Sequence, residues 1–171
     1  MFSYRFIFSA GLIFLAAFTR LIPHPANFAP VMAIALFAGA HSVKKTDAIW
    51  IPLLAMFLSD LVIGFHSLQI LIYALIFIVS ILGFYLRNNS SFTKVFGFSL
   101  LGSSIFFIVS NFFVWAFSGM YSMNLTGFIE CYTLAIPFFQ NSIAGDLFYS
   151  TALFGGMYLL EKSKQVEPLV A

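Results

Sequence analysis

Long apolar stretches, interrupted only by short polar turns, cover almost the whole chain of 171 residues and leave it very few possible folds. Only 8% of the residues are charged and 61% are hydrophobic, whereas a soluble domain contains about 25% charged residues. Such a chain cannot cover a globular surface with groups that water solvates, which argues against a cytosolic enzyme or a disordered tail. The net charge of +2 is too small to hold nucleic acid by its phosphates. The sequence therefore predicts an integral membrane protein.

The apolar stretches divide into six segments, which we interpret as six transmembrane helices of an all-α protein with one domain. A helix needs roughly 20 apolar residues to cross the hydrocarbon core of a bilayer, at about 1.5 Å per residue. We interpret the first segment as a retained helix and not as a cleaved signal peptide, because no clear small-x-small cleavage site precedes Arg20. The predicted helices cover residues 2–19, 31–41, 48–65, 68–86, 95–117 and 138–160.

Residues 20–30, with the sequence R-L-I-P-H-P-A-N-F-A-P, separate the first two predicted helices. Pro23, Pro25 and Pro30 each lack a backbone donor, and each disfavours a helical conformation in the residue before it. The segment is therefore predicted to be a stiff, extended loop.

The apolar stretch at residues 127–160 is too long for a single crossing of the membrane. Pro137 lies within it and is the expected point of interruption, because proline removes one helical hydrogen bond. We therefore expect a short surface helix at residues 127–136, followed by the last transmembrane helix.

The distribution of Lys and Arg predicts how the helices are oriented, because cytoplasmic loops of membrane proteins carry an excess of positive charge. With the N-terminus in the cytoplasm, seven basic residues fall on the inner side and only Arg20 on the outer side. Both termini are therefore predicted to be cytoplasmic. The seven inner residues are Arg5, Lys44, Lys45, Arg87, Lys94, Lys162 and Lys164.

In this predicted orientation, polar and aromatic side chains gather near the outer ends of the helices. The inner half of the bundle contains few polar groups other than Ser and Thr hydroxyls. A charge at the centre of a membrane helix costs roughly 2.5 to 3.5 kcal/mol, so such residues face a bundle interior or a wet cavity. The simplest arrangement is a substrate pocket open to the outside, covered by the loop at residues 20–30. A channel would need a polar lining through its full depth. The candidate substrate-binding residues are Arg20, His24, Asn27, Asp60, His66, Tyr73, Asn111, Trp115, Asn141 and Asp146.

Several of these residues also have a structural interpretation. Arg20 and Asp60 are either an ion pair that holds the first helix against the third, or direct contacts to a substrate. Asp146 has no obvious cationic partner in the sequence. The candidates for this partner are Arg20, a histidine and a cation on the substrate. Asn111 and Trp115 lie one turn apart on one helix face, which suits an amide-and-aromatic platform, although Trp115 is equally suited to anchor the helix at the membrane interface.

Cofactors, metal ions and catalysis are not indicated by the sequence. His24, Asp60, His66 and Asp146 are suitable metal-ligand types, but no two of them have metal-site spacing on one helix. The phosphate-binding pattern G-x-x-x-x-G-K-[ST] is absent, so we expect no ATP site within this chain. No pair of residues suggests a catalytic mechanism. We therefore predict a protein that is not an enzyme.

Small residues at short spacing predict that some helices approach each other closely. Three such pairs occur in the predicted helices: Ala35 with Gly39, Gly102 with Ser103, and Ala152 with Gly156.

Four stretches of the chain resemble a bacterial membrane family of uncharacterised function. They are R-L-I-P-H-P-A-N-F-A-P at residues 20–30, P-L-L-A-M-F-L-S-D-L-V-I-G-F-H at 52–66, S-N-F-F-V-W at 110–115 and I-P-F-F-Q-N-S-I-A-G-D at 136–146. That family in turn is similar to the S-components, the substrate-binding membrane subunits of energy-coupling factor (ECF) transporters.

This resemblance implies a six-helix bundle in the bacterial inner membrane that captures a small, vitamin-like organic solute from outside. It also implies uptake driven by an ECF coupling subunit and two ATPases as partners, with no nucleic acid involved. On this hypothesis Arg20 and Asp60 orient charged groups of the solute, while Asn111 and Asn141 donate hydrogen bonds to it or accept them. The alternative hypothesis is a scaffold of the cell envelope that binds partner proteins and transports nothing.

Overall fold

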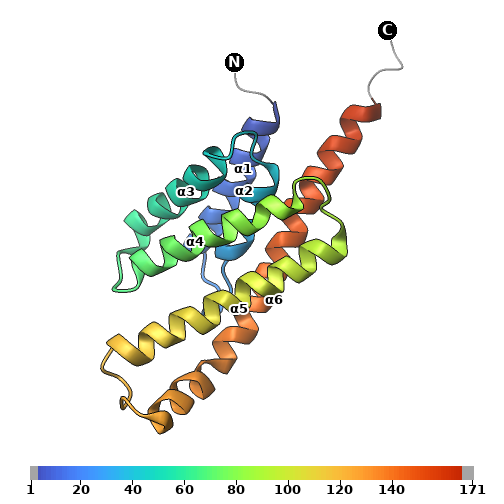
Figure 1. Cartoon of the computed structure of the whole chain (residues 1–171). Helices are drawn as coiled ribbons and strands as arrows, with labels where there is room; N and C mark the ends of the chain where they lie inside the picture. Colours follow the sequence, from blue (N-terminus) through green and yellow to red (C-terminus); the bar gives the residue numbers. More distant parts are fainter. Residues whose placement is uncertain (1–3, 167–171) are drawn as a thin grey trace.

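The computed structural model describes residues 4–166, which form six α-helices and no strands (Figure 1). The chain reverses direction after each helix, so that the connections fall at two ends of the bundle. Connections 22–30, 64–68 and 118–124 lie at what we name the proline-loop end, and connections 42–46 and 87–91 lie at the opposite end. The helices are α1 (Tyr4–Phe18), α2 (Val31–His41), α3 (Asp47–Ile63), α4 (Gln69–Gly83), α5 (Phe92–Phe117) and α6 (Leu125–Val166), with the 3-10 turns η1 (Thr19–Leu21) and η2 (Phe84–Leu86).

Three helical segments are long and apolar enough to cross a membrane: Gln69–Leu86, Phe92–Phe117 and Leu125–Ser163. The outward-facing surface of the bundle carries large apolar side chains, among them Trp50, Ile70 and Phe92, which are exposed on three different helices. Soluble proteins rarely expose apolar surface on this scale, so the bundle suits a lipid environment.

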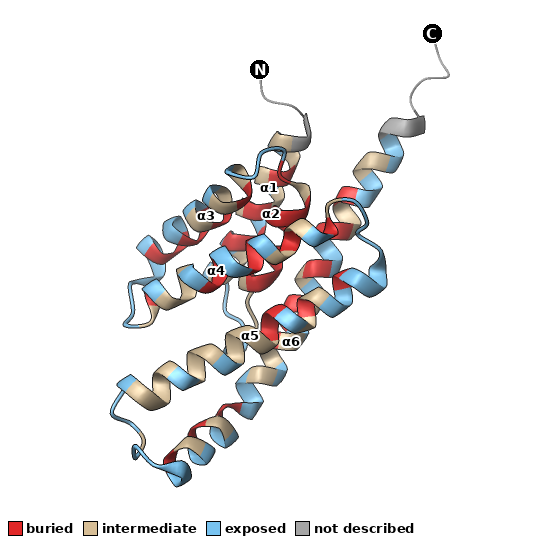
Figure 2. Cartoon of the chain, viewed as in Figure 1, coloured by how far each residue is buried: buried red, intermediate tan, exposed pale blue. Residues whose placement is uncertain are grey.

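The short helix α2 lies at the centre of the bundle, where all residues from Met32 to Ala40 are buried (Figure 2). Its 11 residues span about 16 Å, roughly half the hydrocarbon thickness of a bilayer. A helix that is apolar on every side is stable only when other helices surround it, and α2 contacts α1, α3, α4, α5 and α6. The bounds predicted for this helix, residues 31–41, are confirmed.

The helices α2 and α4 touch backbone to backbone at Gly39 and Gly83. A Cβ atom built on Gly39 would lie 2.1 Å from the carbonyl oxygen of Ser80 and 2.7 Å from the Cα atom of Gly83. The close approach expected from Gly39 is therefore present. The small-residue pairs in the sequence did not identify Gly83, the glycine of α4 that faces Gly39.

The predicted interruption at Pro137 is wrong, because α6 runs without a break from Leu125 to Val166 with Pro137 inside it. The surface helix expected at residues 127–136 is the first part of α6. A proline removes one hydrogen bond, and membrane helices tolerate this loss where neighbouring groups compensate for it. The first part of α6 pairs with the second half of α5, and this hairpin projects from the body of the bundle (Figure 1).

Candidate functional site

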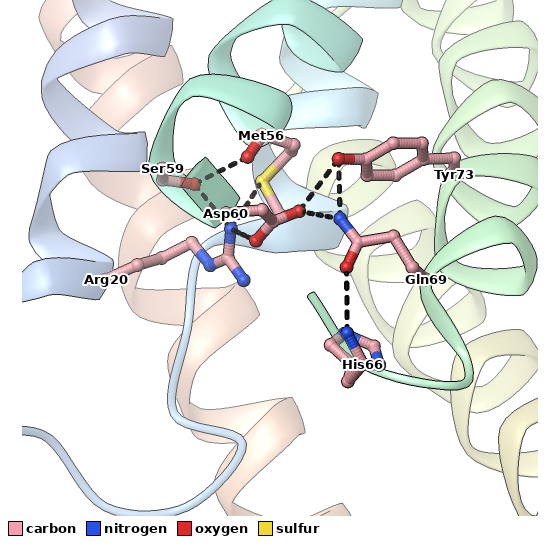
Figure 3. A network of polar contacts seen from close by, with 7 residues as sticks. All are labelled: Arg20, Met56, Ser59, Asp60, His66, Gln69 and Tyr73. Carbon is pink, nitrogen blue, oxygen red and sulfur yellow. Dashed lines mark hydrogen bonds and ion pairs between the residues drawn. The ribbon is translucent and has the colours of Figure 1, made fainter. Parts of the chain in front are cut away.

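A polar network at the proline-loop end joins η1, which follows α1, to α3 and α4 (Figure 3). The Nη1 atom of Arg20, in η1, donates to Asp60 Oδ1 at 2.7 Å and to Ser59 Oγ at 2.5 Å. The same nitrogen lies 3.7 Å from the Sδ atom of Met56. The ion pair expected between Arg20 and Asp60 is therefore present, and it links the end of α1 to α3.

The second carboxylate oxygen of Asp60 binds two donors from α4. Asp60 Oδ2 accepts a hydrogen bond from the Tyr73 hydroxyl at 2.9 Å and another from Gln69 Nε2. Gln69 Nε2 also donates to the Tyr73 hydroxyl at 2.6 Å. Asp60 is only 2% exposed, so these donors and Arg20 replace the water that an ionised carboxylate requires. Asp60 holds the network together and leaves little of its own surface for a substrate.

Gln69 was not among the residues predicted for the site. It is the first residue of α4, and a polar residue at a helix end is usually solvated. The available signal was its spacing from Tyr73, because residues four apart share one helix face. Its side-chain oxygen also accepts a hydrogen bond from the backbone N–H of His66, at 3.4 Å, which connects the network to the loop before α4.

Asp146 of α6 binds the N-terminus of the central helix α2. Its Oδ1 atom accepts a hydrogen bond from the backbone N–H of Ala33 at 3.1 Å, and its Oδ2 atom accepts one from the Ser103 hydroxyl at 2.7 Å. The first N–H groups of a helix have no partner within it, and the positive end of the helix dipole favours a carboxylate there. The partner of Asp146 within the described residues is thus a helix end and a hydroxyl, which the sequence did not reveal.

The other end of α2 is bound by a positive side chain. Arg87, beyond η2, donates from Nε to the carbonyl oxygen of Gly39 at 2.9 Å and from Nη2 to that of Ser42 at 3.0 Å. Carbonyl groups at a helix C-terminus lack helical partners and favour a cation. The central helix α2 therefore has the carboxylate of Asp146 at its N-terminus and the guanidinium of Arg87 at its C-terminus. Each of these side chains binds backbone groups that lack a partner within the helix.

A cavity of about 440 Å³ opens between these elements at the proline-loop end. This volume falls within the range of sites for small organic molecules, roughly 300 to 1,000 Å³. Six of the predicted site residues line it: Arg20, His24, Asn27, His66, Asn111 and Asp146. The remaining lining is mostly apolar, with Val31, Met32, Met56, Ile63, Leu68, Ile72, Phe106, Val114 and Phe138 among the residues that contribute.

Asn111 presents an unused acceptor in this cavity. Its Nδ2 atom donates to the carbonyl oxygen of Phe107 at 2.8 Å, which leaves the side-chain oxygen without a donor among the described residues. Polar atoms in a largely apolar cavity usually bind water or a ligand. Asn111 is therefore placed to accept a hydrogen bond from a bound molecule.

Four predicted site residues do not line the cavity: Asp60, Tyr73, Trp115 and Asn141. Asp60 and Tyr73 lie behind it in the Arg20 network. The indole N–H of Trp115 donates to the carbonyl oxygen of Ser122 at 3.1 Å, which ties α5 to the following loop. Asn111 and Trp115 thus do not form the shared platform that their spacing suggested.

Asn141 fastens the proline-containing loop to α6. Its Nδ2 atom donates to the carbonyl oxygen of Ala26 at 2.9 Å. One turn further along α6, Gly145 lies so close to the loop that an added Cβ would be 3.2 Å from the Cα atom of Phe28. The ring of Phe28 also packs against Phe148 and Tyr149. The loop that borders the cavity is therefore held in place by a hydrogen bond and by ring contacts.

We expect Asn141→Ala to loosen this loop, because one hydrogen bond contributes about 1 kcal/mol. Amide hydrogen exchange measures the effect at Phe28, whose N–H donates to the Pro25 carbonyl oxygen at 2.9 Å. Exchange at this amide should accelerate about fivefold, as expected for that free energy. Asn88→Ala, an exposed position at the opposite end, serves as the control. Equal exchange rates in the Asn141→Ala and Asn88→Ala variants would contradict the anchoring role.

A second cavity, of about 400 Å³, lies at the opposite end between α5 and α6. It is lined by His41, Glu161 and several hydroxyl-bearing residues as well as by aromatic rings. This end is thus less uniformly apolar than the sequence suggested. Ser150, which lines this cavity, and Ser99 join α6 to α5 through their hydroxyls at 3.2 Å, and both side chains are buried.

Among the described residues, no three His, Cys, Asp or Glu side chains gather as a metal ion would require. His24 and His66 line the cavity, whereas Asp60 points into the Arg20 network. The four residues that the sequence offered as metal ligands, His24, Asp60, His66 and Asp146, therefore do not all contribute to one cluster.

Comparison with known proteins identifies the family. The chain belongs to DUF6580, a family of unknown function, whose sequence profile matches residues 2–168. No curated protein and no solved structure matches the chain significantly.

Proposed function

We propose that this member of DUF6580 is a membrane receptor that captures a small organic solute for uptake, in the manner of an ECF S-component. The observation that carries the proposal is the cavity of about 440 Å³ at the proline-loop end, because residues from α2, α3, α4, α5 and α6 and from two loops converge on it. Few polar groups in a largely apolar hollow are typical of a ligand site. A scaffold would gain nothing from keeping such a hollow open.

On this proposal the bundle crosses the inner membrane of a bacterial cell six times, with both termini in the cytoplasm. The cavity then opens to the outside. The apolar surface of the helices supports a lipid setting, and the excess of Lys and Arg at the opposite end supports the orientation. The α5–α6 hairpin and the proline-containing loop would border the entrance.

Uptake against a gradient would draw its energy from a partner or from coupled ions, because the sequence carries no phosphate-binding loop of its own. A coupling subunit with two ATPases is the partner proposed from the resemblance. The fixed contact between the loop and α6, through Asn141, favours a receptor whose cavity is largely formed before the solute arrives.

The test is binding of small molecules to the purified protein in detergent. We expect native mass spectrometry and thermal-shift assays against a panel of vitamins, nucleobases, amino acids and organic acids to identify a solute. Asn111→Ala should weaken its binding about tenfold, because the variant lacks the half-buried side-chain oxygen that would accept a hydrogen bond from the solute. Asn88→Ala should bind the solute like the wild type.

The scaffold hypothesis makes the opposite prediction. If no compound binds and cell-envelope proteins co-purify instead of ATPases, the receptor proposal is wrong. If a compound binds but equally well to the Asn111→Ala variant, the cavity is not the site at which it binds.

A further inference from the structure

The guanidinium of Arg20 is held by one nitrogen only. All three of its contacts, to Asp60 Oδ1, Ser59 Oγ and Met56 Sδ, are made by Nη1. Arginine has five N–H groups, of which Nη1 carries two. The N–H groups of Nε and Nη2 have no acceptor among the described residues, and in Figure 3 no dashed line reaches these atoms. One edge of the guanidinium is therefore unused.

This unused edge belongs to a side chain that lines the cavity. The Arg20 side chain is 14% exposed, so it is partly withdrawn from solvent while its free N–H groups stay accessible to a bound molecule. The Nε–H group and one N–H group of Nη2 are parallel, and together they match the two oxygens of a carboxylate. Arg20 is thus prepared to bind a carboxylate with two hydrogen bonds.

The network behind Arg20 fixes the direction of this edge. Asp60 is itself held by Gln69 and Tyr73 of α4, so the carboxylate cannot easily turn away from the guanidinium. A donor that is already oriented loses less conformational entropy when a ligand binds. The free edge therefore presents a rigid pair of donors.

The charges around the cavity determine what else the solute carries. Arg20 contributes one positive charge, and Asp60 and Asp146, when ionised, contribute two negative ones. A bound carboxylate alone would add a further negative charge to a poorly solvated region, which is unfavourable. Asp146 lines the same cavity, is only 3% exposed and pairs with no cationic side chain among those that the structure describes, residues 6–163. Its hydrogen bonds come only from the Ser103 hydroxyl and from backbone N–H groups at the N-terminus of α2, which carry no full positive charge.

We infer that the solute is a zwitterion with an apolar body, whose carboxylate binds the free edge of Arg20 and whose cationic nitrogen faces Asp146. This inference rests on the proposed function and specifies its substrate class. The apolar body would lie against side chains such as Ile72, Phe106 and Phe138, which line the cavity between the helices.

The experiment compares three matched series of probes on the purified full-length protein. Free amino acids with apolar side chains carry both groups, their amides lack the carboxylate, and the corresponding carboxylic acids lack the amine. We expect measurable binding of at least one free amino acid by calorimetry, and a loss of about tenfold or more when either group is removed.

Arg20→Lys separates recognition from folding. A lysine keeps the positive charge beside Asp60 but has no paired donors for a carboxylate. The thermal stability of the Arg20→Lys variant should stay near that of the wild type, while its binding of amino acids should weaken about tenfold or more. Amide binding should change little. Asp146→Asn should reduce the preference for the amino acid over the acid that lacks the amine.

Two outcomes distinguish the possible failures. If a different solute from the broader panel binds and lacks a carboxylate or a cationic nitrogen, the zwitterion inference is overturned and the receptor proposal stands. The same holds if Arg20→Lys binds its solute as well as the wild type. If no probe of any kind binds, both proposals are overturned.

Discussion

Gly83→Val is expected to prevent α2 and α4 from packing and to leave little folded protein. A Cβ atom on Gly83 would lie 2.3 Å from the carbonyl oxygen of Leu36 and 2.8 Å from the Cα atom of Gly39. These neighbours are backbone atoms of the central helix, so no side chain can rotate to make room. Overpacking of a core usually costs about 1 to 3 kcal/mol, and separation of two helix backbones should cost about 3 kcal/mol or more. Size-exclusion chromatography and thermal unfolding in detergent measure the effect.

Gly97→Val provides the matched control. Gly97 lies within α5, and an added Cβ would meet no other atom within 4 Å. This variant should elute as a single species with nearly unchanged thermal stability. If Gly83→Val behaves like Gly97→Val, the close contact between α2 and α4 does not exist.

Asp60→Ala is expected to destabilise the protein and to abolish solute binding together. The substitution leaves the partly buried guanidinium of Arg20 without its counter-ion, and it removes the acceptor of Gln69 and Tyr73. Loss of one partner of a buried ion pair costs about 3 to 5 kcal/mol, because the remaining charge is unpaired. Thermal unfolding should therefore occur at a clearly lower temperature. Glu130→Ala, which removes an exposed carboxylate, should have little effect.

The double variant Arg20→Met with Asp60→Ala distinguishes the two effects. Removal of both charges leaves no unpaired ion, so much of the lost stability should return. Solute binding should stay absent, because the donors of Arg20 are gone. Recovery of binding in the double variant would contradict the binding role of Arg20, and normal stability of Asp60→Ala alone would contradict the structural role of the network.

The helices themselves could be predicted from the order of apolar and polar residues. The bounds of α2 agree with those expected, and the ion pair between Arg20 and Asp60 is present. Both results follow from local rules, because prolines exclude helix from the loop before α2 and an isolated charge in an apolar segment needs a partner. Six of the predicted site residues also share one cavity, since the alternation of helix direction places every second helix end together.

Other features depended on contacts that a single helix does not reveal. Gln69 belongs to the Arg20 network only because α4 lies against α3. Arg87 was predicted only to lie among the basic residues of the inner side, yet it binds the C-terminus of α2. Pro137 was expected to interrupt the helix, but α6 continues through it and packs against α5.

The sequence by itself determined that the chain is a bundle of apolar helices, because a helix satisfies its own backbone groups and needs only length and apolar side chains. The tertiary structure decided what each polar residue does. Asp146 illustrates the difference, since its partner Ala33 is 113 residues away and is recognised through a backbone N–H that every residue except proline possesses. Such a partner has no signature in the order of side chains. Only the position of α2, surrounded by the other helices with its N-terminus beside the cavity, assigns Asp146 to that helix end.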